Sequence, residues 1–457
     1  MLRIVTSALL LLLIVCIAVA SPASAAQQNA GPVTAKLAAA SPEELTSMLT
    51  GLLSTGDDRK DFLRKIDTLD NASKSQLIPA LLNELGNDDH NYQAVLALGR
   101  IGPLALPGLL KILQDPGDSR RQHAVLALGK MGPKAASADS LLIKAAKEPD
   151  VHMHETVVTA LGQIGPVTQL NAEITPILIA ALKDNVPDCE SAVGSFGAPA
   201  VPAVRLVFKN STDVKLRHRA LVALYQMGPK AAPAVPDLIP AIKDPEFRAD
   251  AVLALGAIGP AAKDAVPSLI SVMQCKPGYW DVPPPSRYSE DKVRENATYA
   301  LALIGPPAVV TPVLIDAYKK DTPGSINALE RLGAPAVPPL LEMLKDPAAS
   351  VGKQNGILNI FIGMGPQAAA AVPDIIPMID DDAHLANASL ALGAMGPAAK
   401  DAVPALIAIL HKDYGSKGMD AIHGMTSKEC AAEGLEGIGT PEALAAAKEY
   451  RASIADK

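Results

Sequence analysis

The amino-acid sequence predicts an all-α protein, an α-solenoid (superhelix) of about eleven stacked helix-turn-helix repeats of about 31 residues. A glycine that closes an apolar helical run recurs at nearly regular intervals between Gly102 and Gly439. Small and aliphatic residues supply most of the apolar content, which is 49% of 457 residues, whereas aromatic residues make up only 3%. The 39 prolines and 33 glycines fall at fixed places in the repeat, so they indicate helix ends rather than disorder.

Each repeat follows the same order of residues. Runs such as "AVLALGRIG" (94–102) place apolar residues at i, i+3, i+4 and i+7, which predicts an amphipathic first helix. Gly-Pro then ends this helix, because glycine tolerates a left-handed C-cap and proline cannot continue the helix. A short turn of small residues follows, and a second proline opens the second helix, as in "VPSLISVMQ" (266–274). One such pair cannot bury its apolar stripe, so we expect successive pairs to stack.

The ends of the chain and two long intervals depart from this pattern. Residues 1–25 combine a basic start, an apolar core and an Ala-x-Ala pattern, which predicts a secretory signal peptide cut after Ala25. This segment places the protein in the periplasm, the cell envelope or outside the cell, and an uncleaved anchor is the alternative. We expect a linker at 26–40 and the repeat domain at 41–457. Insertions lengthen two intervals, a proline-rich and aromatic loop at 275–293 and a polar one at 411–428.

Charge and composition exclude several classes of partner. The net charge is −7, and the basic residues are spread along the chain, so no stripe is suited to the phosphates of a nucleic acid. No polybasic cluster and no second long apolar segment is evident, so we expect no membrane contact beyond the signal peptide. Three cysteines follow the signal, Cys189, Cys275 and Cys430, and the sequence does not decide whether any two are bridged.

The pattern "AVLALGxIGP" followed by "AVPxLIxxLKD" resembles the short HEAT repeats of the phycobiliprotein-lyase type. The resemblance covers roughly residues 41–457 and implies a stack of helical pairs, but the repeat is a general scaffold and implies no single activity. Two enzymes have a similar architecture. Deoxyhypusine hydroxylase holds iron through recurring His-Glu pairs, and the phycobilin lyase handles a tetrapyrrole.

The segment "HMHE" (152–155) is the candidate metal site. In the hydroxylase pattern, His and Glu lie seven and six residues before the helix glycine, where this chain has Glu155 and Thr156 before Gly162. The other repeats carry no His-Glu pair at these positions, so the hydroxylase interpretation is disfavoured. A single-metal site made of His123, His152, His154 and Glu155 remains the weaker alternative to a solvated loop and helix start. Common catalytic motifs are missing, so we favour a protein that is not an enzyme and expect no cofactor.

The insertion at 275–293 is the favoured binding site. It contains Tyr279, Trp280, Arg287 and Tyr288, and residues of these three types dominate interface hot spots. Insertions in solenoids often lie on the binding face. The sequence therefore predicts an exported scaffold that binds another protein and could also self-associate. The alternatives are that Trp280 covers neighbouring repeats, or that the protein is a repeat-based enzyme or accessory factor, lyase-like or hydroxylase-like, which uses a metal or a tetrapyrrole.

Overall fold

The computed structural model describes Leu63, Ile66, Asp67 and residues 69–166, 169–275, 288–412 and 425–455. Helices form almost all of these residues, and no strand occurs among them, so the predicted all-α class is confirmed. Contacts divide the chain into unit 1, Met1–Ala234, and unit 2, Val235–Lys457. The predicted signal peptide and linker lie outside the described residues.

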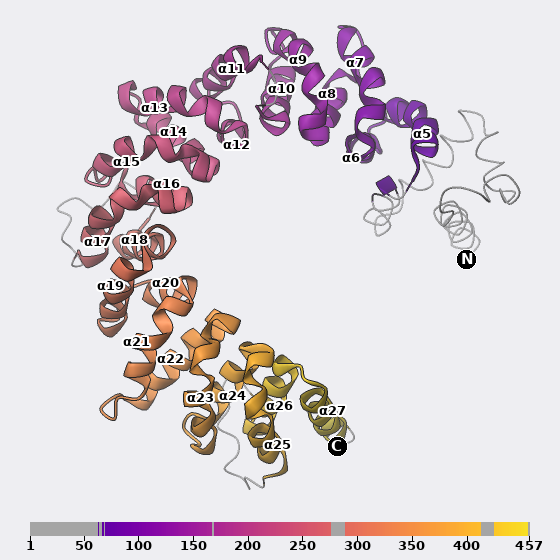
Figure 1. Ribbon diagram of the computed structural model, residues 1–457. Coiled ribbons are helices and arrows are strands. Elements are labelled where there is room, and N and C mark those ends of the chain that lie inside the picture. Colours follow the sequence, from indigo (N-terminus) through magenta and orange to yellow (C-terminus); the bar gives the residue numbers. More distant parts are fainter. Residues whose placement is uncertain are drawn as a thin grey trace, which may run out of the picture. The chain divides into compact units, whose positions relative to one another are not determined.

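Unit 1 consists of helical hairpins arranged in two layers (Figure 1). Its first helices, each followed by a repeat glycine, are α6 (Asn91–Ile101), α8 (Arg121–Met131), α10 (Val151–Ile164), α12 (Cys189–Phe196) and α14 (Val214–Met227). Its second helices are α5 (Asn71–Glu84), α7 (Leu106–Gln114), α9 (Asp139–Ala145), α11 (Asn171–Lys183) and α13 (Val201–Asn210). Successive first helices pack against one another, so the apolar stripe of each repeat is buried by its neighbours.

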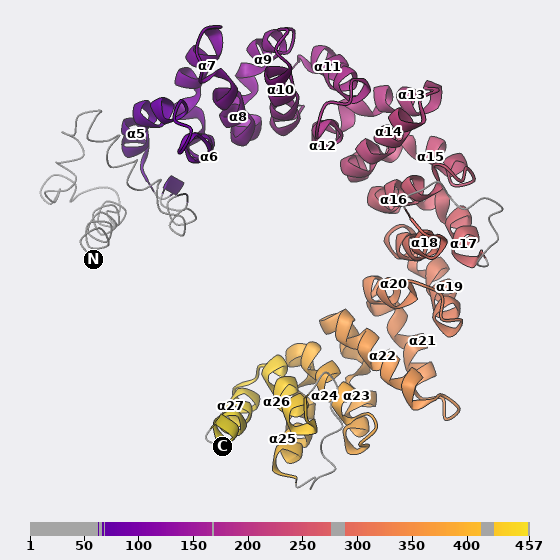
Figure 2. The same cartoon turned by 180° about the vertical axis from the view of Figure 1, so that it is seen from behind.

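Unit 2 repeats this arrangement, as the reverse view shows (Figure 2). Its first helices are α16 (Arg248–Ile258), α18 (Glu290–Ile304), α20 (Ser325–Leu332), α22 (Val351–Met364), α24 (Leu385–Ala394) and α26 (Ser427–Ile438). Its second helices are α15 (Val235–Ala241), α17 (Val266–Gln274), α19 (Pro307–Lys319), α21 (Val337–Leu344), α23 (Val372–Ile375) and α25 (Val403–His411), and α27 (Pro441–Ala455) ends the described chain. The two units together contain the eleven first helices that the glycine pattern predicts for the described repeats.

Gly439 adopts the predicted left-handed cap, with φ 73° and ψ 10°, but most of the other repeat glycines adopt a more restrictive conformation. Gly102 has φ 74° and ψ −137°, and Gly132 has φ 63° and ψ −142°. This region is close to the mirror image of extended backbone and is accessible almost only to glycine, whereas the left-handed helical region also admits asparagine. The turn that follows is a 3₁₀ helix in most repeats, for example η5 (Gly259–Ala265), and Pro267 then opens α17 as predicted.

Gly305 is the exception among the marked glycines, with φ −80° and ψ 146°. Two prolines follow it, and Pro307 forces Pro306 into an extended conformation with ψ 131°. Helix α19 therefore begins at Pro307 without a 3₁₀ turn. The helix ends at Gly-Pro as predicted, but the left-handed cap is absent here, because the second proline changes how the chain leaves the first helix.

A second set of glycines sets the distance between successive first helices. We number positions back from the repeat glycine, so that Gly162 is at G−3 of the run that Gly165 closes. A Cβ atom on Gly162 would lie 2.5 Å from Cα and 2.6 Å from the carbonyl oxygen of Ala192 on α12. The same position is glycine in six of the repeats, Gly99, Gly129, Gly162, Gly194, Gly256 and Gly393. Glycine at G−3 thus allows the backbones of neighbouring repeats to approach closely.

Among the described residues, two segments are long and apolar enough to cross a membrane, Asn91–Gln114 and Val351–Asp380, contrary to the expectation from sequence. Neither is a single straight helix, because Gly102 and Gly365 interrupt them with φ values of 74° and 58°. Helix α6 has 11 residues and α7 has 9. At about 1.5 Å per residue, each is roughly half as long as the ~30 Å hydrocarbon core of a bilayer. The apolar character of these segments is explained by packing between neighbouring repeats.

All three cysteines in the described residues are free thiols. Cys189 and Cys430 are buried, and burial is the main cause that raises their pKa values, to about 12 and about 11. Glu190 raises the pKa of Cys189 further, in opposition to Arg219, whose guanidinium lies 2.8 Å from Sγ. Such thiols are protonated and unreactive at neutral pH, which agrees with buried thiols rather than with a disulfide framework.

Gly162→Ala is expected to destabilise unit 1 by about 1–3 kcal/mol, because the added methyl group would overlap the backbone of α12. The measurement is the urea concentration at the midpoint of unfolding, with unfolding monitored by circular dichroism. Gly352→Ala is the matched control, since nothing lies within 4 Å of a Cβ at Gly352 in the first turn of α22. The control should be neutral or stabilise by about 0.5 kcal/mol. Equal effects of the two substitutions would contradict the packing role of Gly162.

Candidate functional site

The residues of the candidate metal site lie at the start of α10, but they do not converge. His152 is exposed, and its Nδ1 lies 3.8 Å from Glu155. His154 Nδ1 instead lies 2.9 Å from the carbonyl oxygen of Ala146. His123 lies on α8, and its Nδ1 has no hydrogen-bond partner among the described residues. Within the described chain, no group of three or more His, Cys, Asp or Glu side chains is placed to hold a metal ion.

His154 occupies a position with a structural role in several repeats. It lies at G−11, and a carbonyl oxygen can only accept, so its Nδ1 carries the proton in the contact with Ala146. Arg121 at G−11 of α8 donates from Nε to the carbonyl oxygen of Leu113 at 3.2 Å. Arg217, Arg248 and Gln354 make the same contact, with Phe208, Ile242 and Leu344. This position therefore caps the last turn of the preceding helix, whose carbonyl groups have no helical partner.

The aromatic insertion is described only at its ends. Tyr279, Trp280 and Arg287 lie outside the described residues, as does most of the second insertion (413–424). Tyr288 is half-buried. Ser289 caps α18 by accepting from the backbone nitrogen of Lys292 at 3.2 Å. The insertion therefore leads directly into the first turn of α18.

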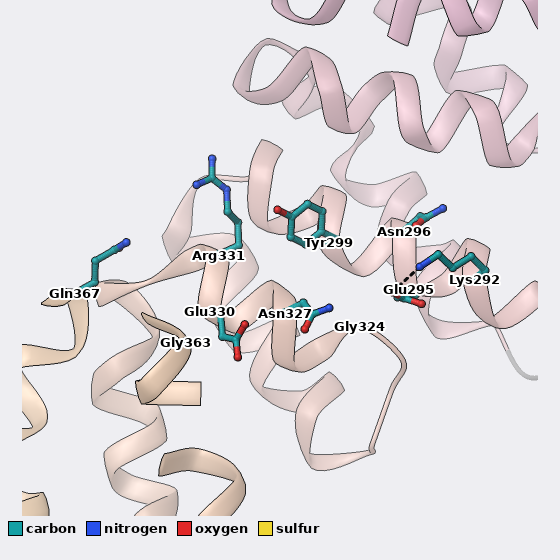
Figure 3. A pocket seen from close by; sticks show the side chains of 10 residues that line it. All are labelled: Lys292, Glu295, Asn296, Tyr299, Gly324, Asn327, Glu330, Arg331, Gly363 and Gln367. Atoms are coloured by element: carbon teal, nitrogen blue, oxygen red, sulfur yellow. Dashed lines mark hydrogen bonds and ion pairs between the residues drawn. The ribbon is translucent and has the colours of Figure 1, made fainter. Parts of the chain in front are cut away.

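A cavity of about 600 Å³ opens among the first helices of three successive repeats, α18, α20 and α22 (Figure 3). Four residues of α18 spaced as one helical face form one wall. Residues of α20 and its N-cap, the end of α22 and the 3₁₀ helix η7 (Gly365–Ala371) form the rest. The lining residues are Lys292, Glu295, Asn296, Tyr299, Gly324, Asn327, Glu330, Arg331, Gly363 and Gln367. None of these residues was among the predicted site residues, although Tyr288 precedes Lys292 by only four residues in the sequence.

The cavity lies where the G−3 glycine is missing. Three successive repeats carry Ala302, Glu330 and Ile362 at this position. In other repeats, glycine at G−3 commonly faces a larger side chain at G−2 of the next repeat. In the α20–α22 pair this order is reversed, because Glu330 at G−3 lies against Gly363 at G−2. Of these three residues, only Glu330 lines the cavity, and its carboxyl group lies against Gly363. The sequence signal that could have revealed the cavity is therefore the run of three repeats without this glycine.

Some charged side chains of the cavity form an ion pair, and others do not. Lys292 Nζ lies 2.8 Å from Glu295 Oε1, so these two charges neutralise each other. Glu330 is half-buried, and no cation pairs with it in the described part of the chain. Burial alone raises the pKa of its carboxyl group above the usual value. Arg331 is exposed, and Figure 3 shows its guanidinium group directed away from the carboxylate of Glu330.

Glu330→Gln is expected to raise the melting temperature near neutral pH relative to the wild type. Because the folded-state pKa of Glu330 is raised, its contribution to stability is fully present below the unfolded value of 4.5 and is lost as pH rises through the folded value. The gain should therefore disappear below about pH 4, where both states bind the proton. Differential scanning calorimetry near neutral pH and below about pH 4 measures this difference in melting temperature. Exposed Glu342 on α21 supplies the control Glu342→Gln, and an equal gain there would contradict the effect of burial.

Comparisons with known proteins agree with the helical hairpins described above. A sequence model of HEAT repeats matches residues 74–142 and 106–195. A search of curated proteins gave no significant match.

Among solved structures, yeast importin-β (Kap95p) is similar at 14% identity and a TM-score of 0.41, covering 100% of this chain and 72% of that protein. A Kap121p triple mutant shares 14% identity at a TM-score of 0.41, covering 97% of this chain and 54% of that one. The chain thus spans about half the length of Kap121p. The Kap95:Nup1 complex matches at 12% identity and a TM-score of 0.43, over 94% of this chain and 70% of the other.

The matched residues cover α5 to α12, and the same hairpin, with its repeat glycine and second-helix proline, recurs through unit 2. The chain therefore contains HEAT repeats.

Proposed function

We propose that this protein is an exported scaffold, built from short HEAT repeats of the phycobiliprotein-lyase type, which binds a segment of another protein. The binding site proposed is the cavity formed by α18, α20 and α22. The observation that carries the proposal is that polar side chains from three successive repeats line this cavity, where Glu330 occupies the position that is glycine in six other repeats.

The chemistry of the lining favours a peptide segment over a small cofactor. Pockets for small molecules are mostly apolar and enclose their ligand. This cavity is lined by the carboxamides of Asn296, Asn327 and Gln367 and by the phenol of Tyr299. A carboxamide both donates and accepts hydrogen bonds, as the backbone of an extended peptide requires. Tyr299 is 40% exposed, so it offers the aromatic surface that is enriched in protein interfaces.

The position of the aromatic insertion in the chain supports the same site. Residues 276–287 include Tyr279, Trp280 and Arg287, and they precede the helix that supplies Lys292, Glu295, Asn296 and Tyr299. A binding segment could therefore contact both the cavity and the insertion. Residues of these types would add to the affinity.

Tyr299→Ala is expected to weaken capture of the partner at least tenfold, because a central tyrosine in an interface contributes about 1.4 kcal/mol or more. The measurement is capture of proteins from the exported fraction on immobilised wild type and variant, quantified by mass spectrometry. Tyr225→Ala is the matched control, because Tyr225 also lies on a first helix and is 45% exposed.

Selective loss with Tyr299→Ala would support the cavity as the binding site. Retention by Tyr299→Ala, or equal loss with Tyr225→Ala, would reject it. A third variant, with residues 276–287 replaced by a Gly-Ser linker of equal length, should reduce capture if the insertion contributes. It should leave the melting temperature unchanged, whereas a large drop would indicate that Trp280 covers the repeats.

Export of the chain is expected to remove residues 1–25. The apolar segment followed by Ala23-Ser24-Ala25 supports this step. Intact mass measurement of the protein from its native source should give a chain that begins at Ala26. A full-length chain recovered from the cytoplasm would contradict export, and a full-length chain in the membrane fraction would indicate an uncleaved anchor.

A further inference from the structure

Glu330 has a placement that its repeat position does not explain. Six repeats have glycine at G−3, and most of them place a larger side chain opposite it on the next helix. Here the carboxyl group reaches from α20 to α22 and lies where a Cβ on Gly363 would be, so any side chain at 363 would displace it. The glycine at 363 therefore leaves room for this carboxylate at the junction of two repeats.

The carboxylate of Glu330 lacks a cation in the part of the chain that the structure describes. Lys292 is paired with Glu295, and the exposed guanidinium group of Arg331 is directed away in Figure 3. A half-buried carboxylate without a counter-ion is costly, and a bound cation would remove that cost.

The groups around Glu330 are suited to an organic cation. Tyr299 of α18 and Glu330 of α20 line the same cavity, and the face of an aromatic ring attracts ammonium and guanidinium groups. Asn327 and Gln367 line the same cavity and carry carbonyl oxygens that accept hydrogen bonds. The side chain of Gln367 lies against Gly333, which fixes its direction. An anionic ligand would instead be repelled by Glu330, and solvated Arg331 would offer only weak attraction.

We infer that this cavity receives a lysine or arginine side chain of the bound segment, with Glu330 as its counter-ion and Tyr299 against its charged end. This inference rests on the proposed function, because it names the chemistry of the segment that the scaffold binds. Glu330 makes the site selective, since a neutral or acidic side chain would leave the carboxylate desolvated and unpaired.

The test uses the full mature chain and the probe peptide acetyl-Gly-Lys-Gly-amide, with saturation-transfer difference NMR as the readout. We expect saturation of the lysine methylene protons with the wild type and about tenfold weaker binding with Glu330→Gln. Tyr299→Ala should weaken binding about threefold, and Tyr299→Phe should retain it, because the ring face and not the hydroxyl group contacts the cation. Glu342→Gln should bind as the wild type does, which controls for the loss of one negative charge.

Equal binding by wild type and Glu330→Gln, or equal binding of a peptide with norleucine in place of lysine, would overturn the inference. Butylammonium bound as strongly as the peptide would assign the site to free amines rather than to a protein segment.

Partner capture separates this inference from the proposed function. Capture that is lost with Tyr299→Ala but kept with Glu330→Gln retains the scaffold and rejects the cation site. Absence of any captured protein, with binding of the lysine peptide that depends on Glu330, retains the cation site and rejects the scaffold.

Discussion

The close approach of successive first helices is the contact on which the rest of the structure depends. Glycine at G−3 removes the side chain that would separate two helices, as at Gly162 and Ala192, and the alanines beside it complete the interface. Each contact joins neighbouring repeats only, so the interior extends by local steps without long-range pairing. This explains why small aliphatic residues, rather than aromatic ones, fill the interior of a chain of this length.

Polar residues near the start of the first helices also connect successive repeats. The G−11 side chains of Arg121, His154 and Arg248 cap the preceding second helix, so they connect one repeat to the next through orphaned carbonyl groups. A histidine that suggested metal chemistry in the sequence is thus one of several interchangeable donors. Its neighbour His152 is exposed in the first turn of α10, and Glu155 lies in the second turn.

The sequence predicted the all-α class, the helix boundaries at glycine and proline, and the number of repeats, because periodicity determines these features directly. It did not predict the mirror-extended conformation of Gly102 or the exception at Gly305, since these depend on backbone geometry and on the second proline at 307. The cavity was missed for a different reason. Tyr299 comes from one repeat and Asn327 and Glu330 from the next, and single-repeat patterns treat them as solvated residues. Only the comparison of equivalent positions across repeats shows that they share a cavity.

Two departures from the repeat pattern in unit 2 act in opposite directions. Between α24 and α26, glycines stand on both sides, at Gly393 and Gly437, and a Cβ on Gly437 would lie 2.6 Å from the carbonyl oxygen of Gly393. Between α20 and α22, Glu330 replaces the glycine, lies against Gly363 and lines a cavity. Proteins that give up packing at one place commonly do so where a ligand supplies the missing contacts. In a chain whose repeats interact only with their neighbours, the loss of stability at the cavity stays confined to three repeats. The remaining repeats can therefore hold the cavity in a fixed shape.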